Sequence, residues 1–335
     1  MNRDAANAIR HRSDDDRGHY ESYFMRANHP REPLAFWIRY TIFVPRGRPE
    51  AAVGEQWAMF FDGTTDQHAA VKTVHPFDRC AFDAARLGAT IDGSELDGDS
   101  LVGNTSGGGH ALAWDLRYTS PQSPLLLLKP RYYDIGFPKA KALVGSPNAV
   151  FDGTLRVDDR EVVVNGWVGS QNHNWGLQHT DRYAWGQVAG FDEDPEAFLE
   201  CSTAQIKLGP VYSPRFTLVV LRLDGEEHRF NGLRRAVLAR GRYEFFRWTL
   251  DTQARGVRIR ASISAPGERF VALPYDNPPG GVKTCLNSKL ASCTLTIERP
   301  GRPIRTLTTA HRAAFEILTD RSDHGVRVLA APSSA

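Results

Sequence analysis

Short stretches rich in aromatic and β-branched residues, separated by tight-turn dipeptides, recur along almost the whole chain. Residues 35–44 read AFWIRYTIFV, residues 56–61 read QWAMFF and precede Asp62-Gly63, and residues 110–118 read HALAWDLRY. Such stretches favour β-strands, and Asp-Gly steps favour hairpin turns. Over 335 residues the pattern predicts antiparallel barrels or sandwiches, arranged as two domains or as one large β domain.

Helical patterns are few and short. We expect one helical turn over 22–27, a short helix over 76–86 with proline at its first position, and an amphipathic helix over 309–318. Most of the second half, from 198–208 to 290–298, again carries strand signals. The chain is therefore expected to be all-β with minor helices.

An unusual polar and aromatic run, GSQNHNWGLQHTDRYAWG, occupies residues 169–186. It separates two predicted strands, 161–167 and 183–188. Asparagine and glycine suit a turn, but a surface turn has no need of two histidines and two tryptophans. The run therefore predicts the rim of an apolar pocket with a few placed donors and acceptors. A domain boundary is expected between residues 165 and 200, and clefts between domains commonly hold ligands.

The charge balance excludes some partners. The chain has 41 basic and 39 acidic residues, which gives no electrostatic reason to expect nucleic acid or an anionic membrane. The N-terminus has no apolar core segment, and the most apolar run, residues 125–128, is far too short to span a bilayer. We expect a soluble, cytoplasmic protein without stable membrane insertion. Whether it forms a homo-oligomer is left open.

The four cysteines, Cys80, Cys201, Cys285 and Cys293, are expected to be free thiols in a cytoplasmic chain of this size. Cys285 and Cys293 are close enough in sequence to face each other in a hairpin. No CxxC or Cys/His spacing suggests a structural zinc site, so no metal ligand is predicted.

One family resemblance follows from these motifs. The segments NHNWG at 172–176 and DRYAWGQ at 181–187 resemble the AttH-like group of carotenoid 1,2-hydratases. Tocopherol cyclases and lipocalin-like Diels–Alderases are more distantly similar. The segments YFMRAN at 23–28, FWIRY at 36–40 and QWAMF at 56–60 fit the same group, so the resemblance covers most of the chain.

The resemblance implies two consecutive lipocalin-like antiparallel β-barrels, which we place at residues 1–180 and 181–335. It also implies an apolar cavity at or near their junction, and a polyene, prenyl or other hydrophobic small molecule as substrate. Neither a metal nor an organic cofactor is expected.

The implied chemistry, addition of water to an alkene or closure of a ring, needs a proton donor and a stabilised cation. His173, His179 and Asp181 are the candidate acids, and the indoles of Trp175 and Trp185 are candidate walls for the cation. A pericyclic reaction needs only a shaped apolar cavity and one or two donors to a polarised carbonyl. Each residue also has a structural alternative: Trp175 can plug a barrel end, and His173 can be a satisfied core histidine.

Asn174 and Arg182 are candidate polar contacts to substrate. Asn174 can instead cap its own turn, and Arg182 can simply pair with Asp181. Further candidates for the cavity wall are the aromatic residues Trp37, Trp57, Trp114 and Tyr133, some of which must be core because barrel residues alternate inward and outward.

Three functions remain open at this point. The leading hypothesis is an enzyme that hydrates, cyclises or isomerises a hydrophobic small molecule by acid catalysis or by templating. The alternatives are a non-catalytic carrier of such a molecule and a scaffold whose barrels are filled by side chains. A cavity below about 300 Å³ at the junction would favour the scaffold.

Overall fold

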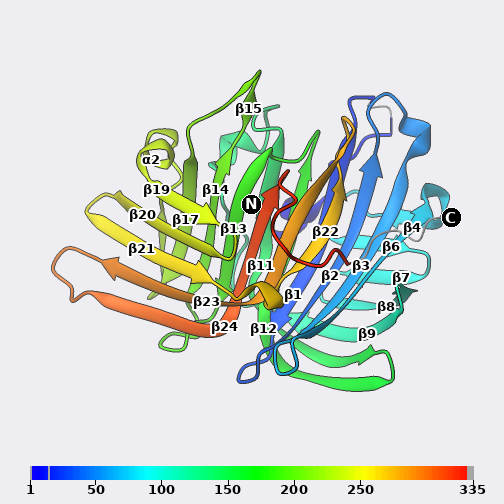
Figure 1. Cartoon of the computed structure of the whole chain (residues 1–335), viewed down its shortest axis with the longest axis horizontal. Coiled ribbons are helices and arrows are strands. Elements are labelled where there is room, and N and C mark those ends of the chain that lie inside the picture. The colour runs from blue at the N-terminus through cyan, green and yellow to red at the C-terminus, as the bar shows by residue number, and fades with distance from the viewer. Residues whose placement is uncertain (1, 14–15, 330–335) are drawn as a thin grey trace.

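A computed structural model of the chain describes residues 2–13 and 16–329. Within these residues, two large antiparallel sheets lie side by side and helical segments are few (Figure 1). The predicted fold class is confirmed. The first sheet contains β1 (His19–Asn28), β2 (Leu34–Val44), β3 (Val53–Asp62), β4 (Gln67–Pro76), β5 (Cys80–Phe82), β6 (Gly88–Ile91), β7 (Ser94–Asp97), β8 (Ser100–Gly107), β9 (His110–Thr119), β10 (Leu125–Leu126), β11 (Ala140–Val157) and β12 (Arg160–Gly176).

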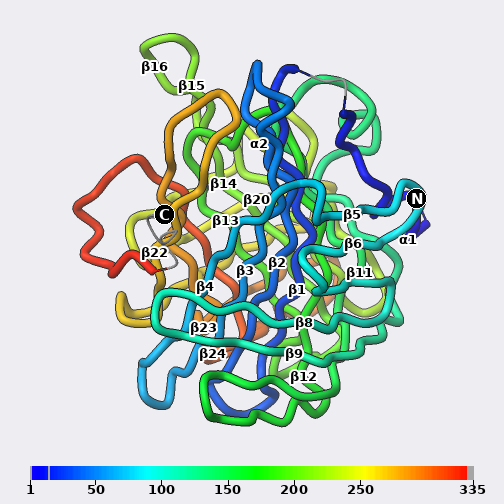
Figure 2. The backbone as a smooth tube through the Cα atoms, turned by 90° about the vertical axis from the view of Figure 1, so that its right-hand side faces the viewer, coloured from blue at the N-terminus to red at the C-terminus, as the bar shows by residue number. Residues whose placement is uncertain are grey.

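The first sheet curls into a nearly closed barrel. Most neighbouring strands are consecutive in sequence, and β1 pairs with β12, which joins the first and last strands of this part of the chain in the middle of the sheet. Figure 2 shows the cyan strands β5–β9 lying across the blue strands β1–β4. The edge strand β4 packs beside β8 and β9, and the hydroxyls of Thr73 and Thr105 are 3.0 Å apart across this seam.

The second sheet has the strand order β18-β17-β14-β13-β24-β23-β21-β20-β19, and β22 pairs with β23. The short helix α2 (Leu233–Leu238) packs against β17 and β20. The strands are β13 (Arg182–Ala189), β14 (Phe198–Gln205), β17 (Phe216–Leu223), β18 (Glu226–Arg229), β19 (Arg240–Glu244), β20 (Arg247–Ala254), β21 (Val257–Ser264), β22 (Val271–Asp276), β23 (Val282–Glu298) and β24 (Arg305–Thr319), with the small hairpin β15 (Lys207–Leu208) and β16 (Val211–Tyr212) outside it.

Strands β1–β3 are buried on both faces. This explains the apolar runs of β2 and β3, whereas β1 also buries polar residues such as Glu21 and Arg26. Because side chains alternate along a strand, Phe36 and Phe60 face the core of the first barrel. Trp37 and Met59 face the other way and pack with Leu273 of the second sheet. The outer face of β1–β3 therefore packs directly on the second sheet, and we call this contact the shared wall of the two barrels. The candidate site lies along it.

All three predicted helices are wrong. Residues 22–27 belong to β1, and 309–318 belong to β24. Residues 76–86 contain the end of β4, one turn of 3₁₀-helix over Phe77–Arg79, and β5. In β1 and in the last seven residues of β24 every residue is buried. A strand buried on both faces shows no alternation, so chance spacing of its apolar residues resembles a helical period.

The polar run 169–186 is only partly a link between strands. Residues 169–176 continue β12, which pairs with β1 on one side and β11 on the other. Glycine is required at two points of this strand: a Cβ on Gly169 would lie 1.7 Å from the Arg26 carbonyl oxygen, and one on Gly176 would lie 2.2 Å from that of Lys139. The polar side chains of this run are thus built into a buried strand, and the turn spans only 177–181.

The four cysteines are free, as predicted. Cys285 and Cys293 lie on the single strand β23, so the predicted hairpin between them is wrong. The first sheet ends at Gly176 and the second begins at Arg182, whereas the domain division at 180/181 stays a prediction. No helix within residues 2–13 and 16–329 is long and apolar enough to cross a membrane.

Candidate functional site

A cavity of about 380 Å³ lies where β1 and β2 of the first sheet meet β13, β14 and β22 of the second. This volume falls in the range of small-molecule pockets and exceeds the roughly 300 Å³ below which a filled scaffold would be favoured. The residues that carry the following argument are Phe24, Trp37, Arg39, His179, Trp185 and Glu316, all of which line the cavity.

The apolar side of the cavity consists of Phe24, Trp37 and Trp185. The Phe24 ring lies 6.0 Å from Trp37 and 6.1 Å from Trp185, between centroids, and meets Trp185 edge-on. Phe24 and Trp37 point outward from the first barrel, and Trp185 comes from β13 of the second sheet. Two sequence-predicted wall residues, Trp37 and Trp185, are thus brought together from opposite sides of the shared wall.

Arg39 of β2 provides a buried positive charge, with the residue only 6% exposed. Its Nε donates to Thr41 Oγ1 at 2.9 Å, and its Nη2 donates to Ser22 Oγ at 2.7 Å. The guanidinium also lies 4.8 Å from the ring centroid of Tyr275. Among the described residues no carboxylate forms an ion pair with Arg39, so its partners are neutral hydroxyls and aromatic faces.

Three tyrosines at the cavity keep their protons. Burial raises the pKa of Tyr20 above its usual value, although the charge of Arg39 opposes this. Burial likewise raises the pKa of Tyr183 and of Tyr275 well above the ordinary range. All three line the cavity, which therefore contains neutral phenols that can donate hydrogen bonds at any physiological pH.

His179 lies in the turn between β12 and β13 and is fully neutral. Burial, reinforced by the charge of Arg39, lowers the pKa of His179 to about 3. Its Nε2 donates to the Asp276 carbonyl oxygen at 3.1 Å, which leaves a lone pair on Nδ1. Its ring packs on Tyr20 with centroids 4.1 Å apart. A histidine in this state accepts a hydrogen bond but has no acidic proton to give.

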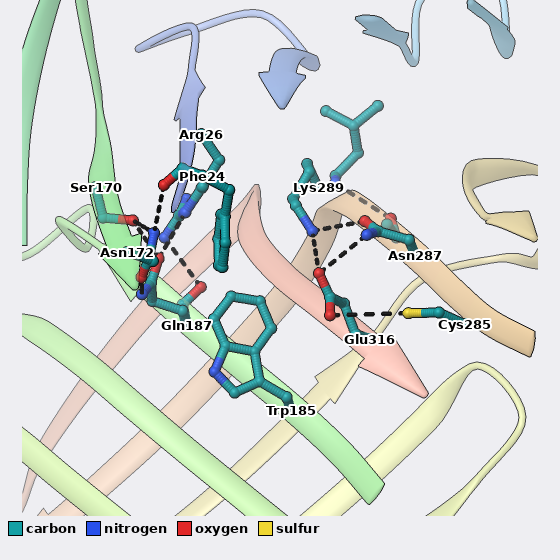
Figure 3. A network of polar contacts seen from close by, with 12 residues as sticks. Phe24, Arg26, Ser170, Asn172, Trp185, Gln187, Cys285, Asn287, Lys289 and Glu316 are labelled. Atoms are coloured by element: carbon teal, nitrogen blue, oxygen red, sulfur yellow. Dashed lines mark hydrogen bonds and ion pairs between the residues drawn. The ribbon is translucent and has the colours of Figure 1, made fainter. Parts of the chain in front are cut away.

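Glu316 of β24 lines the cavity and is paired with a buried lysine. Lys289 Nζ lies 2.8 Å from Glu316 Oε1, and Asn287 Nδ2 donates to the same oxygen at 2.9 Å (Figure 3). Burial lowers the pKa of Lys289, while the charge of Glu316 acts to raise it. The ammonium also lies 5.5 Å from the Trp185 ring centroid. This pairing places the Glu316 carboxyl group in direct contact with a buried amine at the cavity.

A second polar network fixes Trp185. Its Nε1 donates to Glu200 Oε1 at 2.7 Å, and Gln187 Nε2 donates to Glu200 Oε2 at 2.8 Å. Burial raises the pKa of Glu200 to about 7, against the hydrogen bonds from Trp185 and Gln187. Gln187 Oε1 accepts from Arg26 and Ser170 of the first sheet. Figure 3 shows Trp185 between Gln187 of this network and the Lys289–Glu316 pair.

Asp181 lines the cavity, and Arg182 does not. Asp181 Oδ2 accepts from the backbone N–H of Lys207 at 2.8 Å. Arg182 is partly exposed, faces the Tyr212 ring at 4.0 Å, and has its Nε 3.9 Å from an Asp320 oxygen. The Asp181–Arg182 ion pair considered from the sequence does not form.

His173 lies outside the cavity, in a cluster around Glu21 that also contains His19 and Tyr23. His173 Nε2 is 2.8 Å from Glu21 Oε1, and its Nδ1 is 2.8 Å from the Ala6 carbonyl oxygen. Burial acts to raise the pKa of Glu21, but hydrogen bonds from His173 and His19 outweigh it and hold this pKa far below its usual range. Both ring nitrogens of His173 therefore have an oxygen partner inside the protein.

This Glu21 cluster fastens the N-terminal segment to the barrel. The backbone N–H groups of Arg10 and His11 donate to Glu21 at 2.8 and 2.7 Å. The preceding helix α1 (Arg3–Asn7) packs against β11. His173 is thus engaged in a structural ion pair, which matches the structural alternative considered for it.

The other candidate wall residues do not line the cavity, although Trp57 packs edge-on against two residues that do, Trp37 and Tyr275. Trp175 packs with Tyr133 and under the Arg10 guanidinium, at 5.8 and 5.1 Å. Trp57 donates to Glu55, and Trp114 donates to a tyrosine hydroxyl inside the first barrel. None of Trp175, Tyr133, Trp57 and Trp114 lines the cavity, whereas Asn174, the neighbour of Trp175, does.

Sequence reasoning missed Arg39, Glu316 and the three tyrosines. Arg39 is the single charged residue within the apolar strand AFWIRYTIFV. A charge at such a position is either on an exposed face or buried for a functional role. No sequence pattern indicated Glu316 as a site residue, because residues 309–318 were predicted to form a helix rather than the strand β24. No sequence signal relates Tyr275 to Tyr20, which come together only through the packing of the two sheets.

No protein-family model matches the chain. Two curated relatives are the uncharacterized proteins MT0513 and Rv0493c from two strains of Mycobacterium tuberculosis. Each is 27% identical over 249 residues, which covers 72% of this chain and 68% of the relative. These relatives add no function.

Solved structures share the fold over nearly the whole chain. Kievitone hydratase from Nectria haematococca gives a TM-score of 0.55 at 11% identity and covers 96% of this chain and 95% of its own. A candidate AttH, NE1406 from Nitrosomonas europaea, gives 0.54 at 11% identity, with 93% and 97% covered. CghA with Sch210972 gives 0.53 at 11% identity, with 90% and 88% covered. The resemblance seen in the sequence is confirmed for the fold.

Proposed function

We propose that this protein is a cofactor-independent enzyme of the lyase or isomerase type, which hydrates, cyclises or isomerises a hydrophobic small molecule in the junction cavity. The observation that carries this proposal is the makeup of the cavity. Apolar walls from Phe24, Trp37 and Trp185 surround polar groups that include the Arg39 guanidinium, three neutral tyrosines and the neutral His179. Such preorganised groups in a dry site are the basis of electrostatic catalysis.

The polar groups suit chemistry next to a carbonyl. Arg39 and the hydroxyls of Tyr20 and Tyr183 are donors that would stabilise negative charge developing on a substrate oxygen. The Glu316 carboxylate would accept a proton from a neighbouring carbon and return it to another position, so that no net proton is consumed. For a cycloaddition, the same donors would polarise the carbonyl and the walls would hold the reacting chain in a folded shape.

Within this proposal the sequence-based candidates take different roles. Asn174, His179 and Asp181 remain candidate contacts to substrate, with His179 as an acceptor. We assign His173 to the Glu21 cluster, where both ring nitrogens are engaged. Trp185 serves as a wall, but the Lys289 ammonium near its ring disfavours a carbocation there. Templating or proton transfer at Glu316 is therefore preferred over acid catalysis by a histidine.

The fold neighbours support an enzyme, because one of them is a hydratase. A prenyl or polyene skeleton for the substrate, and a cytoplasmic location, belong to the same proposal. A non-catalytic carrier is the competing function, since the apolar walls alone are sufficient to hold a ligand.

Mass spectrometry separates the two functions. Small molecules extracted from the purified protein, and a library of apolar metabolites, are incubated with fresh protein and analysed for products. An enzyme yields isomers of equal mass with new retention times, or products that have gained or lost one water. A carrier returns every bound ligand unchanged.

Two variants tie turnover to the cavity. Glu316→Gln should abolish product formation while the ligand still binds, and Glu298→Gln, outside the cavity, is its matched control. Because Glu316 also neutralises a buried lysine, Tyr183→Phe provides a second variant with a much smaller structural change, controlled by Tyr212→Phe. Full turnover in both cavity variants would remove these residues from the mechanism.

A further inference from the structure

Arg39 brings hydrogen-bond donors without acceptors to the junction cavity. A guanidinium carries five N–H donors. In the described residues, Thr41 and Ser22 accept two of them, and no carboxylate lies within ion-pair distance of Arg39. The indole N–H of Trp37, next along the same face of β2, is also buried without an acceptor. Donor capacity at Arg39 and Trp37, two residues that line the cavity, is therefore unused.

The other buried cations of the described structure are satisfied. Lys289 is paired with Glu316 at 2.8 Å, and Lys72 lies 2.8 Å from Glu55 and 3.0 Å from Asp276. Arg26 has no carboxylate partner either, but it donates to four oxygen acceptors: the side chains of Gln187 and Asn28 and the backbone carbonyls of Gln187 and Arg312. Arg39 differs because its neighbours are two hydroxyls and aromatic rings.

The remaining charges at the cavity do not compensate Arg39. The two acidic residues that line it are Glu316, paired with Lys289, and Asp181, which accepts from the backbone of Lys207. The lining also includes Lys139, Lys141 and Lys207, so positive charges exceed negative ones. A buried charge without a partner is costly, and a ligand that supplies the opposite charge recovers this cost on binding.

We propose that the substrate of the junction cavity is an apolar acid, whose carboxylate, enolate or phenolate oxygen binds Arg39 while its hydrophobic body packs on Trp37, Phe24 and Trp185. This inference rests on the proposed function, because it names the substrate class of the same cavity. A guanidinium is well suited to an anionic oxygen, since its planar N–H groups form charge-assisted hydrogen bonds. The neutral His179 beside it adds no competing charge.

Two fluorescent probes that differ only by an acidic group test this inference without any knowledge of the substrate. The probes are 8-anilinonaphthalene-1-sulfonate, an apolar anion, and N-phenyl-1-naphthylamine, its uncharged counterpart. Dissociation constants for both are measured by fluorescence titration of the full-length protein. In Arg39→Met the anionic probe should bind about tenfold or more weakly than in the wild type, while the neutral probe changes by less than about twofold.

Three further variants make the result decisive. Arg39→Lys should retain most of the preference for the anion. Arg242→Met removes an exposed arginine from a separate surface groove lined by Arg240 and Arg260, and should leave both probes unaffected. If Arg39→Met does not fold, Arg39→Gln replaces it, because the amide can still donate to Ser22 or Thr41 without the charge.

The possible failures have different meanings. If Arg39→Met weakens both probes equally, or neither, Arg39 does not select an anion and the inference is overturned, while the proposed function stands. If the anion is lost equally in Arg242→Met, the probe binds surface arginines and the inference is again overturned. If neither probe binds the wild type, the cavity does not accept apolar ligands and the proposed function fails as well.

Discussion

His173 and His179 come from the same polar run, six residues apart, yet their surroundings differ completely. His173 lies in the Glu21 cluster, where a carboxylate and a backbone carbonyl take both of its ring nitrogens. His179 lies at the junction cavity beside Arg39, where burial and positive charge keep it neutral. The first region pairs its charges and fixes the fold, whereas the second leaves a charge unpaired. An unpaired buried charge is the better indicator of a ligand site.

The largest expected change in stability follows from disruption of the Glu21 cluster. Glu21→Gln leaves the His173 side chain without its charged partner in a fully buried position, which should lower the free energy of unfolding by about 3–5 kcal/mol. Urea denaturation measures this value. The exposed pair Arg321–Asp323 provides the control, because Asp323→Asn should leave the free energy of unfolding nearly unchanged. Equal losses in the two variants would contradict a structural role for the cluster.

The second effect is the pH dependence that arises from His179. Its pKa of about 3 in the folded protein is below its ordinary value of 6.5, so the unfolded chain takes up a proton first as the pH falls. The free energy of unfolding therefore falls as the pH drops from 6.5 to 3, and at pH 4 it is about 3 kcal/mol lower than at pH 7 on account of His179. His179→Phe should reduce the difference in unfolding free energy between pH 7 and pH 4 by this amount. The partly exposed His110 serves as the control position, and an unchanged difference in His179→Phe would show that the ring is protonated normally.

The two tryptophans of the run should also separate the two regions. Trp185→Phe leaves an oxygen of Glu200 without its donor, which should lower the free energy of unfolding by about 1–3 kcal/mol. It also alters the cavity wall, so N-phenyl-1-naphthylamine should bind more weakly. Trp175→Phe changes the packing beside His173, Tyr133 and Arg10, and binding of the probe should stay within about twofold of the wild type. A larger effect of Trp175→Phe on the probe would connect the two regions.

The smallest expected effect concerns Asp181. Its carboxylate accepts a hydrogen bond from the Lys207 backbone, and asparagine retains an oxygen at that position. Asp181→Asn should change stability by less than about 0.5 kcal/mol and turnover by far less than Glu316→Gln. Complete loss of turnover in Asp181→Asn would restore this residue as the acid.

The sequence allowed the all-β class to be predicted because many strands are buried on one face only. Residues 110–118 alternate cleanly, and Leu112, Trp114, Leu116 and Tyr118 are buried in the structure. The same method failed for β1 and β24, since both faces of these strands are covered and no alternation remains. The doubly buried strands β2 and β3 were still predicted, because their aromatic and β-branched residues favour strands without any alternation.

The candidate site could be predicted only in part for a related reason. The run 169–186 supplies Asn174, His179, Asp181 and Trp185 to the cavity, and its composition made it visible. Arg39, Tyr275 and Glu316 come from strands that are distant in sequence and join the site only when the two sheets pack. Single-sequence patterns report local periodicity, and this arrangement is not local.

The wall shared by the two barrels has a consequence for how the protein can be divided. If the chain were cut in the turn after Gly176, β1–β3 would present Trp37, Trp57 and Met59 to water on one fragment, and the other fragment would lose the surface that covers Leu273 and Cys285. Each fragment would then aggregate or bind to the other fragment. We therefore expect that the intact polypeptide is needed both for stable folding and for ligand binding, and that neither fragment functions alone.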